Sequence, residues 1–157
     1  MSPPALRLAR PDDIPQIEKL LSAEWLPPLQ IAEWLETFWV LDRDGTVVGA
    51  AGLEVYGPAG VIRSVVVAPS ERGKGLGDLL SRTAIAEAHK RGVERLYLFT
   101  GDKAPFWARF GFEQCTLDDW EPVARESWQW QAISEHEQIR ALVITMRTDI
   151  ARAVRSI

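Results

Sequence analysis

The chain has 157 residues, of which 46% are apolar and 25% charged, and its net charge is −4. This acidic balance argues against nucleic acid or an anionic membrane as a partner, and no apolar run is long enough to cross a bilayer. The N-terminal sequence is neither apolar nor basic enough for a signal peptide. We therefore expect a cytoplasmic enzyme or binding domain. The length predicts a single domain over residues 1–157, with a core at 5–147 and a tail at 148–157.

The first quarter of the chain predicts a strand followed by two helices. Residues 6–8 alternate as a short strand does, and Pro11-Asp12-Asp13 is a typical helix start. The first helix would place Ile14, Ile17, Leu21 and Trp25 on one face and end before Pro27-Pro28. The second would cover 31–38, where apolar residues recur at helical spacing.

The middle of the chain predicts strands. Residues 38–57 read as two strands joined by Asp44-Gly45, a strong hairpin signal. After a second tight turn at 57–60, the strand at 61–67 is apolar on both faces apart from Arg63 and Ser64, so we expect it to be central.

The remaining segments predict alternating helices and strands. A helical stripe runs from Leu76 to Ala88 and ends at Gly92, a buried strand covers 95–100, and a short helix ends at Gly111. Residues 121–136 are expected to be helical, 139–147 to form the last strand, and 148–157 to fray. The fold class is therefore α/β (α+β), with a mixed central sheet of six to seven strands flanked by about four helices.

A glycine-rich loop separates the central strand from the long helix. Its sequence is Arg72-Gly73-Lys74-Gly75-Leu76-Gly77. Glycines let a backbone approach a ligand closely, the start of a helix favours anions, and two cationic side chains add full charges. The loop therefore predicts a phosphate site, most simply a diphosphate site.

Two familiar phosphate motifs do not fit this loop. A P-loop needs Ser or Thr after its lysine, but Lys74 is followed by Gly75. The dinucleotide motif fails as well, because Asp78 stands where the third glycine belongs.

The stretch VVVAPSERGKGLGDLL resembles the acetyl-CoA loop of the GNAT N-acetyltransferase superfamily, in which Arg or Gln is followed, after two residues, by Gly-x-Gly/Ala. Arg72, Gly75 and Gly77 match this pattern, and PFWARFGF at 105–112 resembles the family's second signature. The wider sequence is similar to the acetyltransferase domain of N-acetylglutamate synthases and to arsenic-resistance-type N-acetyltransferases. The C-terminal Cys-Pro pair of the arsenic-type relatives is absent here.

The resemblance implies a GNAT fold and specific roles for residues. The backbone of residues 72–77 would bind the diphosphate of coenzyme A, and the pantetheine arm would pair with Val65, Val66 and Val67. A backbone N–H of Val65 or Val66 would hold the acetyl carbonyl, as an oxyanion hole does. Trp107, in the second signature, would also contact the coenzyme. Many relatives dimerise, so a homodimer is possible.

Glu54 is our candidate for the general base that deprotonates an acceptor amine. It lies near the end of an apolar strand, where the turn at 57–60 would set it across from Arg63. An ion pair between these two residues is the structural alternative, and the two roles are compatible. Arg63 would also suit a substrate carboxylate.

The usual general acid of the family is a tyrosine at the position of Trp107, and an indole is not a useful acid. Tyr56, Tyr97 or a water is a substitute, and coenzyme A thiolate is also a good leaving group. Cys115 is interpreted as a core residue. With one cysteine and two isolated histidines, His89 and His136, we expect no metal site.

We therefore predict an N-acetyltransferase that moves acetyl from acetyl-CoA to a small amino acid or another carboxylate-bearing amine by direct attack. A peptide N-terminus or an amine antibiotic is the rival acceptor. A non-catalytic acyl-CoA sensor is the rival class.

Overall fold

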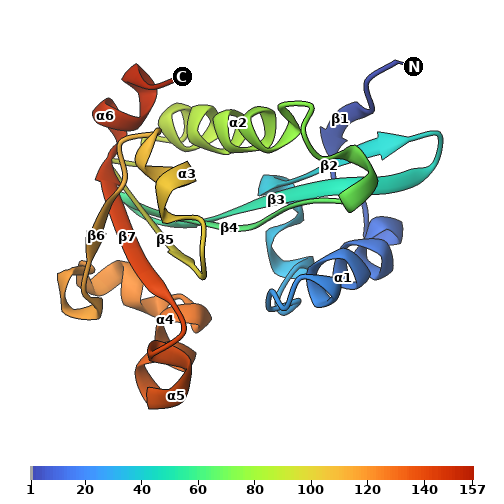
Figure 1. Cartoon of the computed structure of the whole chain (residues 1–157). Helices are drawn as coiled ribbons and strands as arrows, with labels where there is room; N and C mark the ends of the chain where they lie inside the picture. The colour runs from blue at the N-terminus through green and yellow to red at the C-terminus, as the bar shows by residue number, and fades with distance from the viewer. Residues whose placement is uncertain (1) are drawn as a thin grey trace. The chain divides into compact units, whose positions relative to one another are not determined.

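The computed structural model describes residues 2–157 and contains a seven-stranded sheet with strand order β1-β2-β3-β4-β5-β7-β6 (Figure 1). The pairs β1–β2, β2–β3, β5–β7 and β6–β7 are antiparallel, and β4 and β5 run parallel. The mixed sheet with covering helices confirms the predicted fold class. The strands are β1 (Ala5–Leu8), β2 (Phe38–Arg43), β3 (Thr46–Tyr56), β4 (Ala59–Val67), β5 (Arg95–Thr100), β6 (Glu113–Cys115) and β7 (Ile144–Asp149).

Six α-helices lie within residues 2–157, where about four were expected, and three of the six have six residues or fewer. They are α1 (Ile14–Ala23), α2 (Leu76–Lys90), α3 (Ala104–Ala108), α4 (Trp128–Glu135), α5 (Glu137–Arg140) and α6 (Ile150–Arg155). None of the helices in this range is long and apolar enough to cross a membrane. The chain divides into two compact units, the first made of residues up to Leu53 with Arg63–Ala84, and the second of Glu54–Ile62 with Ile85–Ile157.

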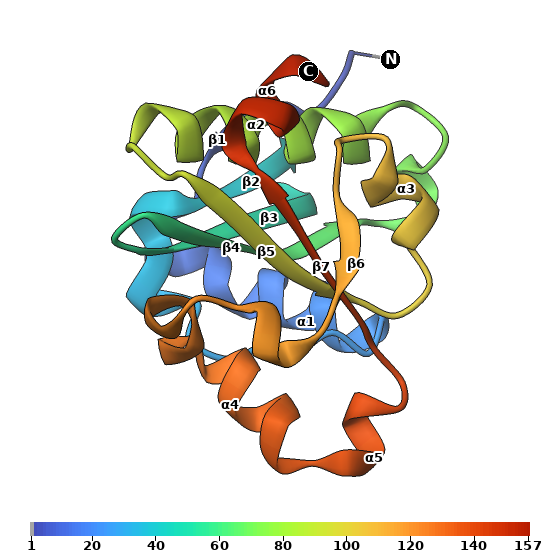
Figure 2. The ribbon, with the colours of Figure 1, turned by 90° about the vertical axis from the view of Figure 1, so that its left-hand side faces the viewer.

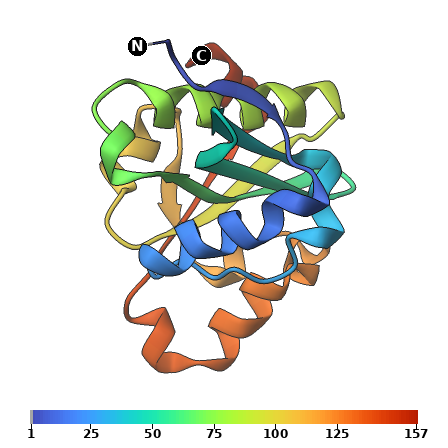
Figure 3. The same ribbon diagram turned by 90° about the vertical axis from the view of Figure 1, so that its right-hand side faces the viewer.

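In the first unit, α1 covers the hairpin of β2 and β3 (Figure 3). Ile17 and Leu21 of α1 are fully buried in a cluster that includes Val40, Ala50 and Val66. The hairpin turn is as predicted, since Asp44 and Gly45 both have positive φ (51° and 90°), as a type I′ turn requires.

Two predictions for the first unit were wrong in detail. Trp25 is not on the apolar face of α1, because the helix ends at Ala23, and Trp25 has φ 60° and is 95% exposed. The helix predicted for 31–38 is a six-residue 3-10 helix, Ala32–Thr37. Phe38 already begins β2, because its side chain is fully buried in the core cluster.

In the second unit, β7 lies between β5 and β6 (Figure 2). Its apolar cluster includes Ala59, Val61, Tyr97 and Trp120, with the Phe99 ring stacked 4.8 Å from Trp120. The long connection between β6 and β7 forms α4 and α5, which lie side by side (Figure 2).

The C-terminal predictions were also wrong in part. The helix expected at 121–136 is interrupted at Ser127, and the strand expected at 139–147 is β7 at Ile144–Asp149, because Glu137–Arg140 forms α5 instead. The tail predicted to fray contains α6, whose Ala153 is fully buried. The prediction of a single domain stays a prediction.

Candidate functional site

The glycine loop joins β4 to α2 in a conformation that only glycine adopts easily. Gly73 and Gly75 have φ +79° and +77°, in the left-handed region. A Cβ atom at either position would meet no atom within 4 Å, so the backbone conformation rather than crowding selects glycine. The first N–H groups of α2, which begins at Leu76, have no partner within the helix. The loop therefore leads directly into a helix N-terminus, a position that favours an anion.

A buried carboxylate anchors the approach to this loop. Glu71 is 5% exposed and accepts two hydrogen bonds from Arg43, to its Oε2 from Nε (2.6 Å) and to its Oε1 from Nη2 (2.8 Å). The Lys74 ammonium lies 3.0 Å from the same Oε1. The pKa of Glu71 is lowered to about 2, mainly by its hydrogen bonds with Arg43 and secondly by the one with Lys74. The network ties the end of β2 to the loop and fixes Lys74 beside it.

Arg72, the first residue of the predicted motif, is held on two sides. Its Nε donates to the carbonyl of Val67 (3.2 Å), and its Nη2 forms an ion pair with Glu24, the residue after α1. Both partners of this pair are partly exposed. Arg72 therefore lies at the loop as predicted, but its guanidinium is already paired with the Glu24 carboxylate.

Strand β4 contains a local break next to the predicted acetyl-binding residues. Ser64 has φ +59°, a left-handed conformation that is costly for a residue with a side chain. Such a residue inside a strand re-aims the backbone groups that follow, here those of Val65. Val65 and Val67 are partly exposed, and Val66 packs in the core of the first unit.

Arg63, just before this break, is 4% exposed and its guanidinium has protein partners. Nη2 donates to the carbonyl of Leu29 (2.5 Å), and Nη1 lies 3.5 Å from that of Gln30. Nε donates to the Ser64 hydroxyl (2.9 Å). Arg63 thus secures the segment after α1 to β4. Its predicted ion pair with Glu54 and its role toward a substrate carboxylate stay predictions.

Glu54 lies near the end of β3 and is fully buried. Its Oε1 accepts hydrogen bonds from the hydroxyls of Ser127 and Tyr56, each at 2.8 Å. Ser127 is itself fully buried and caps α4 by accepting from the N–H of Gln129 (3.3 Å). A buried carboxylate with two hydroxyl donors is held in one orientation.

Comparisons with known proteins decide the family. The model described as "Acetyltransferase (GNAT) family" matches residues 7–112, a span that contains β4 and the glycine loop. The chain belongs to the GNAT acetyltransferase family. The prediction made from Arg72, Gly75 and Gly77 is confirmed at this level.

Two curated relatives of this GNAT chain are named amino-acid acetyltransferase. One, from Mycobacterium tuberculosis, is 30% identical over 121 residues, which cover 71% of this chain and 69% of the relative. Another, from Neisseria meningitidis, is 26% identical over 147 residues, which cover 88% of this chain but 34% of the relative. Against several of these relatives, the chain spans only about a fifth to a third of their length.

Solved structures share the GNAT fold. Rv2747 from Mycobacterium tuberculosis, in complex with CoA, has a TM-score of 0.75 at 23% identity, and the match covers 93% of this chain and 99% of that one. The N-acetylglutamate synthase of Neisseria gonorrhoeae, complexed with coenzyme A and N-acetyl-glutamate, has a TM-score of 0.75 at 22% identity. That match covers 93% of this chain and 35% of the synthase.

Trp107, at the position where the resemblance places the usual tyrosine, lies on α3 and is 6% exposed. Its ring contacts those of Phe106, Phe110 and Phe112, with centroids 5.1, 5.9 and 5.5 Å away. Gly111 ends this segment with φ +87°. The second GNAT signature is thus an aromatic cluster, and the role of Trp107 toward the coenzyme stays a prediction.

The two tyrosines of the chain differ in their surroundings. Tyr97 is 1% exposed, and its hydroxyl donates to Glu121 Oε2 (2.7 Å). Burial is the main cause that raises the pKa of Tyr97 to about 12. Tyr56 is partly exposed and donates to Glu54. Of the two, only Tyr56 combines access to solvent with a contact to the candidate base.

Cys115 on β6 packs against the apolar cluster of the second unit, which agrees with its assignment as a core residue. Burial raises the pKa of its thiol to about 11, so the thiolate that a nucleophile needs is disfavoured near neutral pH.

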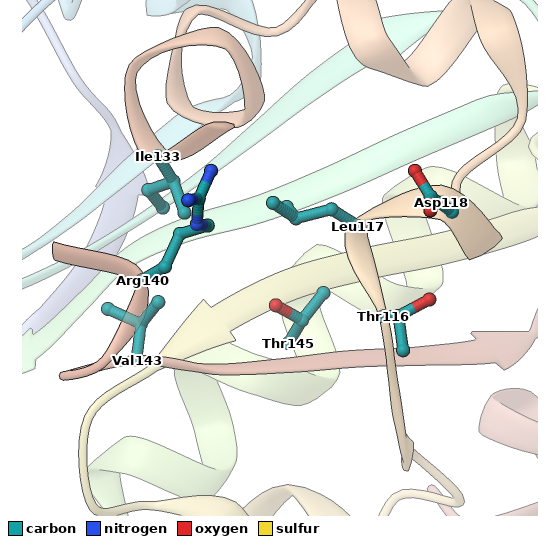
Figure 4. A pocket seen from close by; sticks show the side chains of 7 residues that line it. All are labelled: Thr116, Leu117, Asp118, Ile133, Arg140, Val143 and Thr145. Atoms are coloured by element: carbon teal, nitrogen blue, oxygen red, sulfur yellow. The ribbon is translucent and has the colours of Figure 1, made fainter. Parts of the chain in front are cut away.

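A cavity of about 410 Å³ lies in the second unit (Figure 4). Its walls come from the segment after β6, from α4 and α5, and from the start of β7. Arg140 and Asp118 stand at opposite ends of the lining set, with Leu117 and Thr145 between them (Figure 4). None of the residues predicted for the site lines this cavity.

Several residues of the candidate site were missed by sequence reasoning. Ser127 had one usable signal, since a serine before WQWQ is a typical N-cap. Glu71, Arg43 and Glu24 carried no signal, because long-range ion pairs follow from the register of β2 and the end of α1.

Proposed function

We propose that the chain transfers the acetyl group of acetyl-CoA to a primary amine by direct attack, without a covalent enzyme intermediate. The observation that carries this proposal is the glycine loop, with two residues at positive φ, the N-terminus of α2 directly after it, and Arg72 and Lys74 within it. This donor set suits a diphosphate, which is the anionic part of coenzyme A.

The backbone of Arg72, Gly73, Lys74, Gly75, Leu76 and Gly77 binds the diphosphate in this proposal. Val65, Val66 and Val67 pair with the pantetheine arm. The left-handed Ser64 supports this role, because it turns the groups that follow away from a regular ladder. The N–H of Val65 or Val66 then stabilises the charge that develops on the acetyl oxygen. Trp107 is a further coenzyme contact.

Glu54 takes the proton that the acceptor amine must lose. Its two hydroxyl donors support this role, since they fix the carboxylate in the interior. The alternative, in which Glu54 only neutralises Arg63, predicts a loss of stability without a specific loss of rate when Glu54 is changed to Gln.

The acceptor in this proposal is a small amino acid or another carboxylate-bearing amine. The names of the relatives support this class. The cavity supports it as well, because Arg140 lines it and supplies a cation there, although its Nη1 also donates to the carbonyl of Ser134. Arg63 is the other candidate for the carboxylate, although its donors face backbone carbonyls and Ser64. A cytoplasmic location and a homodimer stay predictions.

An acceptor screen tests the function. The purified chain is mixed with acetyl-CoA and a panel of free amino acids, amine antibiotics and short peptides, and thiol release is followed. We expect turnover with one or more free amino acids. Binding of acetyl-CoA without amine-dependent thiol release across the panel would instead favour the acyl-CoA sensor.

A further inference from the structure

Glu54 has no exposed surface, which limits what it can do as a base. A base must come within hydrogen-bond distance of the proton it removes, directly or through one intervening group. A side chain that is 0% exposed does not contact an acceptor directly. If Glu54 takes the proton, another group therefore connects it to the acceptor.

Tyr56 is the group in contact with Glu54 that is suitable for this connection. The two residues are two positions apart on β3, so their side chains leave the same face of the strand. The Tyr56 hydroxyl lies 2.8 Å from Glu54 Oε1, and Tyr56 as a residue is partly exposed, whereas Ser127, which binds the same oxygen, is fully buried. Tyr56 therefore combines a hydrogen bond to the buried carboxylate with some exposed surface of its own.

We infer that Tyr56 is a catalytic residue that contacts the acceptor nitrogen and relays its proton to Glu54, and that Ser127 is a positioning residue for Glu54. This inference rests on the proposed function. It also supplies the general acid that a tyrosine at position 107 would otherwise provide. The Tyr56 hydroxyl would first pass the proton of the amine to Glu54 and then pass it back to the thiolate.

The relay balances as follows. The nitrogen gives a proton to the Tyr56 oxygen while Tyr56 gives its own proton to Glu54 Oε1. The bond between nitrogen and the acetyl carbon forms, and the carbon–sulfur bond breaks with its electron pair left on sulfur. Glu54 then returns the proton through Tyr56 to the thiolate. An amine that arrives as ammonium loses its additional proton to water.

The chain offers a matched control. Tyr97 also donates to a glutamate, Glu121, at 2.7 Å, but it is 1% exposed. Tyr97→Phe removes the same atom as Tyr56→Phe and also breaks a hydrogen bond to a carboxylate. Each variant therefore removes one hydroxyl that donates to a glutamate, and only the Tyr56 hydroxyl belongs to the proposed relay.

The experiment measures kcat with the best acceptor from the screen, the affinity for acetyl-CoA by calorimetry, and the melting temperature. We expect Tyr56→Phe to lower kcat by about 100-fold or more, the usual contribution of a general acid–base, with acetyl-CoA affinity unchanged. Tyr97 was a second candidate for the acid, but a hydroxyl that is buried with its residue and bonded to Glu121 does not reach the acceptor or the thiolate in this proposal, so Tyr97→Phe should keep its kcat within about threefold of the wild type.

A double variant separates a relay from a structural role. Residues that act as a unit are non-additive, so Tyr56→Phe with Glu54→Gln should be no slower than the slower single variant. Ser127→Ala should lower kcat less than Tyr56→Phe, and Ser127→Thr, which keeps the hydroxyl, should recover most of the loss. Normal turnover in Tyr56→Phe, or rate losses that multiply in the double variant, would overturn the relay alone. A wild type that turns over no acceptor would overturn the proposed function and the relay with it.

Discussion

The Ser127 hydroxyl lies 2.8 Å from Glu54 Oε1, so the residue that caps α4 also holds a buried carboxylate of β3. The two residues are 73 positions apart in the chain. The connection between β6 and β7 therefore does more than join two strands, because the residue that caps its first α-helix also bonds the candidate base.

The dual role of Ser127 predicts a large effect on stability. Ser127→Ala leaves Glu54 with one hydroxyl donor fewer and removes the cap, which together should lower the free energy of unfolding by about 2–4 kcal/mol. Chemical denaturation measures the change. Ser134→Ala is the control, because this exposed hydroxyl bonds only the carbonyl of Gln131, and it should change stability by less than about 0.5 kcal/mol. Equal effects of the two substitutions would contradict the structure.

The backbone of the glycine loop predicts a cost for any side chain there. Gly75→Ala forces a left-handed conformation on a residue with a Cβ atom, which should lower the free energy of unfolding by about 1–2 kcal/mol. Gly101→Ala is the matched control, since Gly101 is not among the positive-φ glycines and its Cβ would also meet open space. A smaller loss at Gly75 than at Gly101 would show that the loop conformation is different.

Glu71 predicts a specific loss of stability in acid. Its pKa falls from the ordinary 4.5 to about 2 in the folded chain, mainly because of Arg43. A lowered pKa stabilises the fold above the unfolded-state value, and this contribution disappears as the pH falls from about 4.5 to 2. Melting temperatures at pH 7 and pH 3 should therefore differ less in Glu71→Gln than in the wild type. If the difference in melting temperature between pH 7 and pH 3 is the same in Glu71→Gln and the wild type, Glu71 is not stabilised by Arg43 as the structure indicates.

The ion pair between Glu24 and Arg72 should compete with the binding of coenzyme A at the loop. Because Glu24 occupies Arg72, Glu24→Gln should release the guanidinium and tighten binding of coenzyme A. An exposed pair of this kind is worth about 0.2–1 kcal/mol, so the gain should be up to about fivefold and should shrink in high salt. Glu33→Gln, a neutralised glutamate in the 3-10 helix Ala32–Thr37, controls for net charge. Weaker binding in Glu24→Gln would mean that the pair helps to place Arg72.

The parts of the fold that sequence predicted are those with strong local signals. Asp44-Gly45 fixes a hairpin, and the apolar run before Pro69 fixes β4, because turn chemistry and a continuous apolar pattern leave few alternatives. Trp25 and the segment 137–140 were misplaced, since helix ends and short helices depend on contacts that no local pattern contains. The glycine loop was predicted because its chemistry is local, whereas the contact between Ser127 and Glu54 joins segments far apart in sequence.

The measurement that tests the central claim most directly is a calorimetric titration of the wild type and of Gly75→Asp with coenzyme A. Gly75→Asp places a negative side chain where the diphosphate is proposed to bind and strains the left-handed backbone. The account predicts binding to the wild type and no measurable binding to a Gly75→Asp variant that still melts cooperatively. Equal affinity in the two proteins would contradict the assignment of the loop.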